Sequence, residues 1–157
     1  MTPRRDGPRP DTSSEGPHRQ LTQTAPPELW GLLVARVFGL PGAEEGRSQV
    51  SPVSSRAVFL MDRADERSPG TSLAPGRRLE PVHLHGVDDT STHLCLPPAR
   101  GRELVGLGWA EPHQFAEFGT EYMVYGPRSP AELEVVLSVI EESIAFARGE
   151  DADARRR

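Results

Sequence analysis

The chain has 157 residues, a formal net charge of −5 and a single cysteine. This length predicts one folded domain, and the negative charge argues against nucleic acid as a partner. No segment approaches the ~20 consecutive apolar residues that span a bilayer, and one cysteine permits no internal disulfide, so we expect a cytoplasmic protein without a membrane partner. The sequence has no lysine, which excludes a Schiff-base nucleophile and the phosphate-binding lysine of a P-loop.

The two ends of the chain have the least apolar character. Residues 1–24 are rich in Pro, Arg, Ser and Thr, and their one aliphatic side chain beyond the initial methionine is Leu21. Such a segment cannot bury enough apolar surface to offset the entropy lost on ordering, so we predict that it is disordered and that His18 lies outside any site. The charged residues 149–157 predict a second disordered segment, which leaves residues 25–148 as the domain.

The first predicted elements of the domain are a helix and two short strands. Prolines open the helix at residues 26–38, apolar side chains recur along one side of it, and Gly39 can end it. The two strands are expected at residues 47–51 and 57–61. Residues 62–76 carry charges, Pro and Gly, and predict a surface loop.

Two alternating segments follow, at residues 80–85 and 91–96, joined by residues 86–90. Successive side chains of a strand point to opposite faces, so the valine and leucines of both segments share one face of a sheet. The side chains expected on the other face are His83, His85, His93 and Cys95. A five-residue hairpin connection sets His83 opposite His93, with Cβ atoms roughly 5 Å apart. Three imidazoles in one patch make this the strongest candidate for a chemical site.

The remaining elements complete the fold prediction. A helix is expected at residues 97–107, an extended piece or turn at 109–113 and a strand at 121–125. The last helix begins with the capping-box pattern Ser129 to Glu132. This order of elements predicts an α+β fold: one mostly antiparallel sheet with helices packed on a single face, which leaves the other face to the histidines. The layout is similar to that of frataxin-like domains at the level of fold alone.

Six short motifs stand in order along the chain. They are Leu40-Pro41-Gly42, Gly46-Arg47-Ser48, Glu80-Pro81-Val82-His83-Leu84-His85, Thr92-His93-Leu94-Cys95-Leu96-Pro97, Gly108-Trp109-Ala110-Glu111-Pro112-His113 and Val124-Tyr125-Gly126-Pro127-Arg128. Together they resemble the luciferase-like domain family, small microbial proteins that share a domain with fungal luciferases, over about residues 29–148. The resemblance implies an oxygen-using enzyme that acts on a pyrone of the polyketide type.

A metal centre is one interpretation of the histidine patch, because imidazole ligates transition metals. The candidate ligands are His83, His85 and His93. A fourth ligand is available in His113, and Glu111 or Glu80 can supply the carboxylate of a two-histidine, one-carboxylate iron site. The alternative is a polar outer sheet face without a metal, so the residues leave the cofactor open between none and a transition metal.

A metal-free site is the second interpretation, because histidine also transfers protons near neutral pH. One histidine among His83, His85, His93 and His113 would take a proton from an enol or phenol, and the resulting anion would react with oxygen. Arg128 or a second histidine would stabilise the developing oxyanion. The candidate substrate-binding residues are Trp109, Glu111 and Tyr125. The structural alternatives are an ion pair of Arg128 with Glu132 or Glu121 and core positions for the two aromatic rings.

The sequence therefore favours an oxidoreductase-like enzyme whose histidine face binds an aromatic or enolic small molecule. A nucleophilic Cys95 is the weaker enzymatic alternative, since a cysteine within an apolar strand is more often a small buried hydrophobe. Two other classes remain open at this stage. One is a non-catalytic module that binds a small molecule or a protein, and the other is a metal-binding domain.

Overall fold

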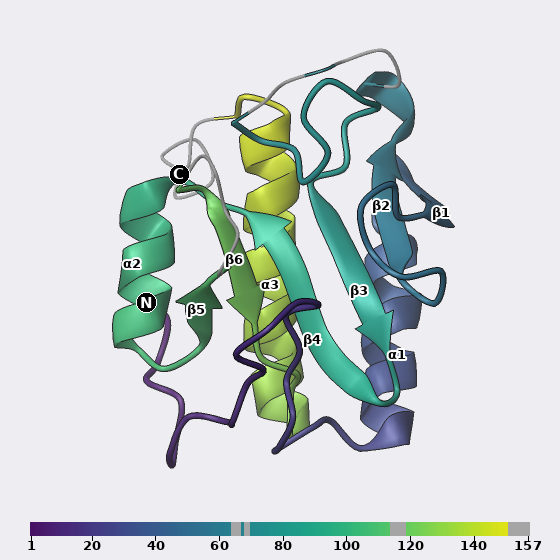
Figure 1. Cartoon of the computed structure of the whole chain (residues 1–157). Helices are drawn as coiled ribbons and strands as arrows, with labels where there is room; N and C mark the ends of the chain where they lie inside the picture. Colours follow the sequence, from purple (N-terminus) through teal and green to yellow (C-terminus); the bar gives the residue numbers. More distant parts are fainter. Residues whose placement is uncertain (64–66, 68–69, 114–118, 151–157) are drawn as a thin grey trace.

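The computed structural model describes residues 1–63, 67, 70–113 and 119–150. A six-stranded antiparallel sheet runs through the molecule in the order β1-β2-β3-β4-β6-β5 (Figure 1). The strands are β1 Ala43–Arg47, β2 Arg56–Leu60, β3 Val82–Gly86, β4 Asp89–Cys95, β5 Ala110–Pro112 and β6 Glu121–Val124. The helices are α1 Pro27–Phe38, α2 Pro98–Gly106 and α3 Pro130–Ala147, with a single 3-10 turn at Met61–Arg63.

The helices begin where proline and capping residues place them. Pro27 stands in the first turn of α1, where its fixed φ suits the helix and its missing N–H is not needed. At α3, the Ser129 hydroxyl accepts a hydrogen bond from the backbone N–H of Glu132 at 3.2 Å. The Glu132 carboxylate turns back to the N–H of Arg128 at 2.8 Å, one residue earlier than in a standard capping box.

One face of the sheet forms the apolar core. Figure 1 shows α1 and α3 side by side behind the sheet, and both contribute to a single buried cluster. The sheet supplies the inward side chains of alternate positions, which include Val82, Leu84, Leu94 and Val124. The predicted α+β fold is confirmed, with one antiparallel sheet and the long helices against one face. No helix in the described part of the chain combines the length and hydropathy needed to cross a membrane.

The predicted first strand is misplaced by four residues. It lies at Ala43–Arg47, whereas residues 49–51 form bends after it. Glu44 and Glu45 are exposed on this edge strand, and charged residues on an edge hide the alternation on which the prediction depends. Part of the predicted loop at 62–76 and most of the predicted tail at 149–157 lie outside the described residues.

The histidine hairpin has the predicted register but a shorter turn. His83 pairs with His93, as expected. The connection is a two-residue turn rather than five residues, because the strands extend to Gly86 and Asp89, and the register shifts after Leu84. The shift leaves the three histidines on the same face and brings Asp89 close to His85.

The N-terminal segment differs most from expectation. Residues 1–24, here called the strap, are predicted to be disordered, whereas the structure places them across the outer face of the sheet in front of β4 and β6 (Figure 1). Gln20 is fully buried, and its side chain accepts from the N–H of Gly126 at 2.8 Å. The N–H of Gln20 in turn donates to the carboxylate of Asp89 at 3.1 Å. Polar hydrogen bonds attach the strap, so a count of its apolar residues does not reveal the attachment.

Candidate functional site

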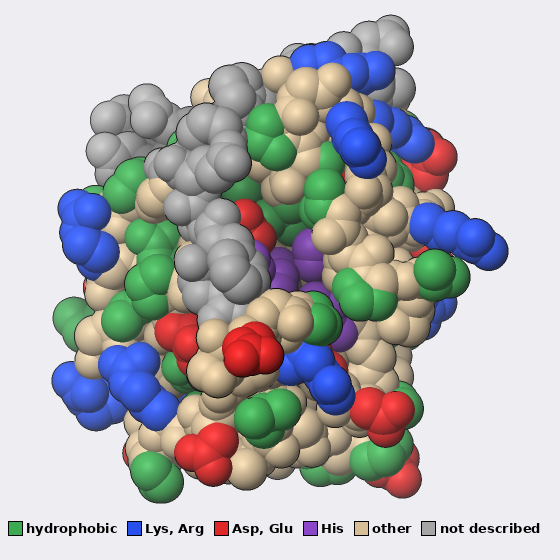
Figure 2. Space-filling model, in the orientation of Figure 1, with side chains coloured by type: hydrophobic (Ala, Val, Ile, Leu, Met, Phe, Trp, Pro, Cys, Tyr) green, Lys and Arg blue, Asp and Glu red, His purple; other side chains and the backbone are tan. Residues whose placement is uncertain are grey.

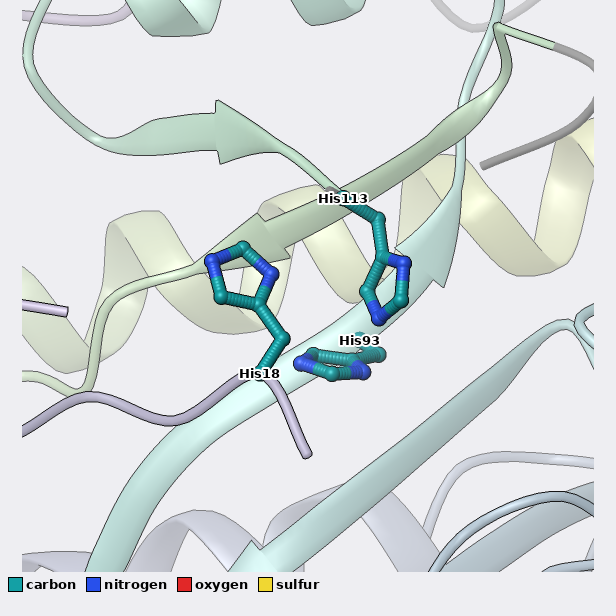
Figure 3. Close-up of side chains that lie close together, drawn as sticks. All are labelled: His18, His93 and His113. Atoms are coloured by element: carbon teal, nitrogen blue, oxygen red, sulfur yellow. The ribbon is translucent and has the colours of Figure 1, made fainter. Parts of the chain in front are cut away.

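All five histidines of the chain gather on the outer face of the sheet. His83, His85 and His93 come from β3 and β4, with ring centroids 4.3 to 5.2 Å apart. His113 follows β5, and its ring lies 4.8 Å from that of His93. The fifth is His18 of the strap, 5.1 Å from His113. Figure 3 shows His18, His93 and His113 converging from three separate segments. We call these five residues the histidine cluster.

The histidine cluster lines a cavity of about 290 Å³. Four of the five rings are buried, and that of His113 is half-buried. The space-filling view shows histidine side chains at the bottom of a hollow in this face of the molecule (Figure 2). The other lining residues are Pro17, Val50, Ser51, Pro52, Leu73 and Glu121. The cavity thus combines titratable groups with a few apolar walls, as small-molecule sites do.

Carboxylates pair with three of the imidazoles. Nδ1 of His83 lies 2.9 Å from Glu80, and Nδ1 of His85 lies 2.7 Å from Asp89. Nε2 of His18 lies 2.9 Å from Glu111. A neutral imidazole has one N–H, and a carboxylate that accepts it fixes the tautomer and the ring orientation. The second nitrogen of each ring then keeps a free lone pair.

Three imidazole nitrogens of the histidine cluster are buried without a partner. Nδ1 of His18, Nε2 of His83 and Nε2 of His93 have no hydrogen bond within the described part of the chain. The three side chains are 2 to 4% exposed. A buried nitrogen without a partner costs roughly 1–3 kcal/mol, and folded proteins satisfy almost all of them. Three such atoms beside one cavity indicate a place prepared for a ligand.

Burial governs the charge of the cluster. Desolvation, and then repulsion from His83 and the other imidazoles, lowers the pKa of His93 well below its usual value. Desolvation likewise lowers the pKa of His113 to about 4, with His18 adding to the effect. The same cause raises the pKa of Glu121 to about 7. His93 and His113 are therefore neutral at physiological pH, and Glu121 can hold or release a proton there.

Glu80 behaves differently although it is fully buried. Burial alone would raise the pKa of its carboxyl, but hydrogen bonds from His83, the N–H of Gln49 and Ser48 outweigh burial and lower it. Glu80 is therefore an anion that lies behind His83, and it is not among the residues that line the cavity.

The structure separates the predicted substrate-binding residues and Arg128 from the cavity. Glu111 lies between His18 and Tyr125, whose hydroxyl donates to it at 3.0 Å. Trp109 packs in the core, and its indole N–H donates to the strap. The guanidinium of Arg128 pairs with Glu132, which is the structural alternative stated above. Glu111 therefore contacts His18, which lines the cavity, and Glu111, Trp109, Tyr125 and Arg128 do not line it.

Cys95 points to the outer face, as its position in the strand predicts, and pairs in register with Glu121. It is 1% exposed and does not line the cavity. Burial raises the pKa of its thiol to about 12, so the thiolate needed by a nucleophile is absent at neutral pH.

Sequence reasoning missed two members of the site. His18 stands in a segment without apolar character, and nothing local to it signals a contact with residues 93 and 113. Glu121 did carry a signal, because alternation along β6 puts it on the same face as Met123, which pairs with His93. Applying to β6 the pattern used for β3 and β4 would have found it.

Comparisons with known proteins agree with the resemblance seen in the motifs. The family model described as "Luciferase domain" matches residues 78–143, which include four of the five histidines. Over this segment the chain is similar to the luciferase-like domain family. It is 30% identical over 167 residues to a luciferase of Armillaria mellea and 27% identical over 168 residues to one of Neonothopanus nambi.

The alignments with these relatives include the strap. Each alignment covers 96% of this chain, so His18 falls within the aligned span, but the chain spans only 62% of the length of these relatives. No solved structure matches the chain at a comparable level. The frataxin-like layout therefore stays a prediction.

Proposed function

We propose that the luciferase-like domain is a cytoplasmic enzyme that uses the histidine cavity to oxidise an enolic or aromatic small molecule with molecular oxygen. The observation that carries the proposal is the set of three buried, unpartnered imidazole nitrogens beside one cavity. Folded proteins pair most buried polar atoms with other protein groups or with ordered water, so three unpaired nitrogens beside one cavity favour a ligand there. The similarity to proteins named luciferase supports an oxidation, since light emission needs an energy-rich oxidised intermediate.

His18 is the best-placed proton acceptor. Glu111 binds its Nε2, so Nδ1 carries the lone pair, and this atom is buried beside the cavity. The same carboxylate also accepts from Thr12 and Tyr125, which keeps it in place. This arrangement, a base oriented by a third group, is the usual form of an activated histidine. Glu111 is accordingly a positioning residue in this scheme.

The reaction then balances without a further co-reactant. The enol O–H proton moves to Nδ1 of His18, and the enolate carbon uses its electron pair to form a bond to one oxygen atom of O₂. The peroxide anion that results takes a proton back, from His18 or from Glu121, whose pKa of about 7 suits the transfer. The product is the substrate plus one O₂, and the imidazolium that His18 becomes after the first proton transfer can stabilise the anion beside it.

The test is oxygen uptake by untagged protein with a panel of 4-hydroxy-2-pyrones and catechols, together with photon counting. A His18→Ala variant should lose about 10²- to 10⁴-fold in rate with an unchanged circular dichroism spectrum. Arg36→Ala, which removes an exposed ion pair of α1 with Glu134, serves as the control and should keep the full rate.

A different result would favour a binding module. If panel compounds raise the melting temperature and leave the oxygen concentration unchanged, the cavity binds small molecules without turnover. A His18→Ala variant with the full rate of uptake would remove His18 from the mechanism.

A further inference from the structure

We propose that His83, His85 and His93 together bind one divalent transition-metal ion, with Glu80 and Asp89 as carboxylates behind two of the ligands. The inference rests on the proposed function, since it concerns the same cavity, and it adds a resident cofactor to it. No residue match or relative's name assigns such a site.

The backbone brings the three ligands together on rigid elements. His83 and His93 are direct partners in the β3–β4 ladder, and His85 follows two residues later on the same face. One potential ligand atom from each residue lies within 4.8 Å of the other two. Nitrogens at a tetrahedral ion are roughly 3.4 Å apart for bonds of about 2.1 Å, so small side-chain rotations would bring all three to bonding distance. Sites on paired strands keep such geometry better than sites on loops.

The hydrogen bonds select which nitrogen would face the ion. Nδ1 of His83 is held by Glu80 and Nδ1 of His85 by Asp89, so Nε2 is the ligating atom in both rings. Nε2 of His83 and Nε2 of His93 are buried and have no partner in the described residues. A histidine that donates its other N–H to a carboxylate is the usual arrangement around protein-bound metals. These orphaned nitrogens are an observation independent of the mere clustering of the histidines.

The donor set limits the chemistry of the ion. Three imidazole ligands suit zinc, iron(II), cobalt(II) or copper, whereas calcium and magnesium require oxygen ligands. Three protein ligands also leave a coordination position for a small molecule. The cavity lies beside this position, since all three histidines line it.

A second group, His18, His93 and His113, competes for the same ion because His93 belongs to both. Its members come from the strap, from β4 and from the segment after β5, so binding there would have to order three separate parts of the chain. Its carboxylate support is also weaker, since Nε2 of His113 lies 3.6 Å from Glu121. The hairpin group is therefore the favoured site, and His18 remains available for proton transfer.

The experiment is a cobalt(II) titration of untagged protein, followed by visible absorption, with elemental analysis after zinc loading and dialysis. One equivalent should bind. His83→Ala, His85→Ala and His93→Ala should each abolish the absorption, and His18→Ala and His113→Ala are the matched controls that should keep it. Where an alanine variant loses its circular dichroism spectrum, His83→Gln keeps the side-chain volume and removes the imidazole. Glu80→Gln should weaken binding by about 10- to 100-fold.

Three results would overturn the metal site. The first is that the wild type binds neither cobalt nor zinc, and the second is that it binds two equivalents. The third is that His18→Ala and His113→Ala lose metal binding while His83→Ala and His85→Ala keep it. The proposed function is tested separately. Oxygen uptake by protein that binds no metal would overturn the metal site and leave the proposed oxidation standing. One bound equivalent of metal without any oxygen uptake would support the metal site and overturn the proposed oxidation.

Discussion

The two faces of the sheet are covered in opposite ways. The inner face packs against α1 and α3 through apolar side chains, whereas the strap covers the outer face of histidines and carboxylates. The change from one face to the other takes a single residue, since His93 lines the cavity and Leu94 is buried in the core. Period-two alternation lets one strand serve both purposes. From this difference we expect that stability and chemistry can be altered separately in this domain.

The contacts that cover the inner and the outer face of the sheet also depend on different forces. Apolar burial is non-directional, so the inner face tolerates exchanges of similar volume. The outer face depends on directed contacts, such as those of Asp89, which accepts from Ser91 and from the strap. Because a buried polar group that loses its partner is costly, each such contact is a specific point of failure.

The sharpest test of this separation compares neighbours in β4. Leu94→Ala should lower the free energy of unfolding by about 2–5 kcal/mol, because it leaves a void in a fully buried apolar cluster. His93→Ala should cost less, since it also removes a buried nitrogen that lacks a hydrogen bond, a relief of about 1–3 kcal/mol. Urea unfolding of both variants measures the difference. Equal losses would mean that the histidine face is a second structural core.

A smaller effect is expected from Glu121, the buried acid of the outer face. Its folded-state pKa of about 7 exceeds the ordinary value of about 4.3, so the native state binds the extra proton. This contribution to stability is complete below about pH 4 and is lost as the pH rises toward 7. Glu121→Gln should therefore be more stable than the wild type at pH 8, by on the order of 1–3 kcal/mol, and nearly equal to it at pH 4.

Melting temperatures of the two proteins at pH 4, 6 and 8 check this prediction. His113, whose pKa is about 4, also titrates at the acidic end of this range, so the difference between variant and wild type is the quantity to follow. Glu134→Gln is the control, because Glu134 is an exposed partner of Arg36 and its removal should change little at pH 8. A difference for Glu121→Gln that does not change with pH would show that its carboxyl titrates normally.

Sequence patterns predicted the apolar face of the sheet and the histidines of β3 and β4 on the other face. They succeeded there because these patterns depend only on residues close together in the chain. Alternation is local, so it placed His83, His85 and His93 on one face and the leucines on the other. The cap at Ser129 is local too. Arg128, in contrast, was a candidate for the site, but a neighbour four residues away, Glu132, takes up its guanidinium.

His18 lay beyond any local signal. It reaches the cluster because Gln20 binds the N–H of Gly126 and Asp89 binds the N–H of Gln20, contacts that span 106 and 69 residues. Composition measures only the apolar surface that a segment can bury, and these contacts bury almost none. A polar segment attached by a few long-range hydrogen bonds is therefore invisible to a prediction based on hydrophobic pattern.

The smallest expected effect concerns this attachment of the strap. Gln20→Ala removes the acceptor of the Gly126 N–H and two donations, to Thr22 and Gln23. The strap should open more often while the sheet stays folded, since segments of low local stability unfold independently. A loss of about 1.4 kcal/mol gives about tenfold faster amide hydrogen exchange in residues 12–23, with exchange in β4 unchanged. Gln49→Ala, which changes a glutamine outside the strap, is the matched control. Equal exchange in wild type and Gln20→Ala would show that other contacts, such as that of His18 with Glu111, suffice to hold the cover of the outer face.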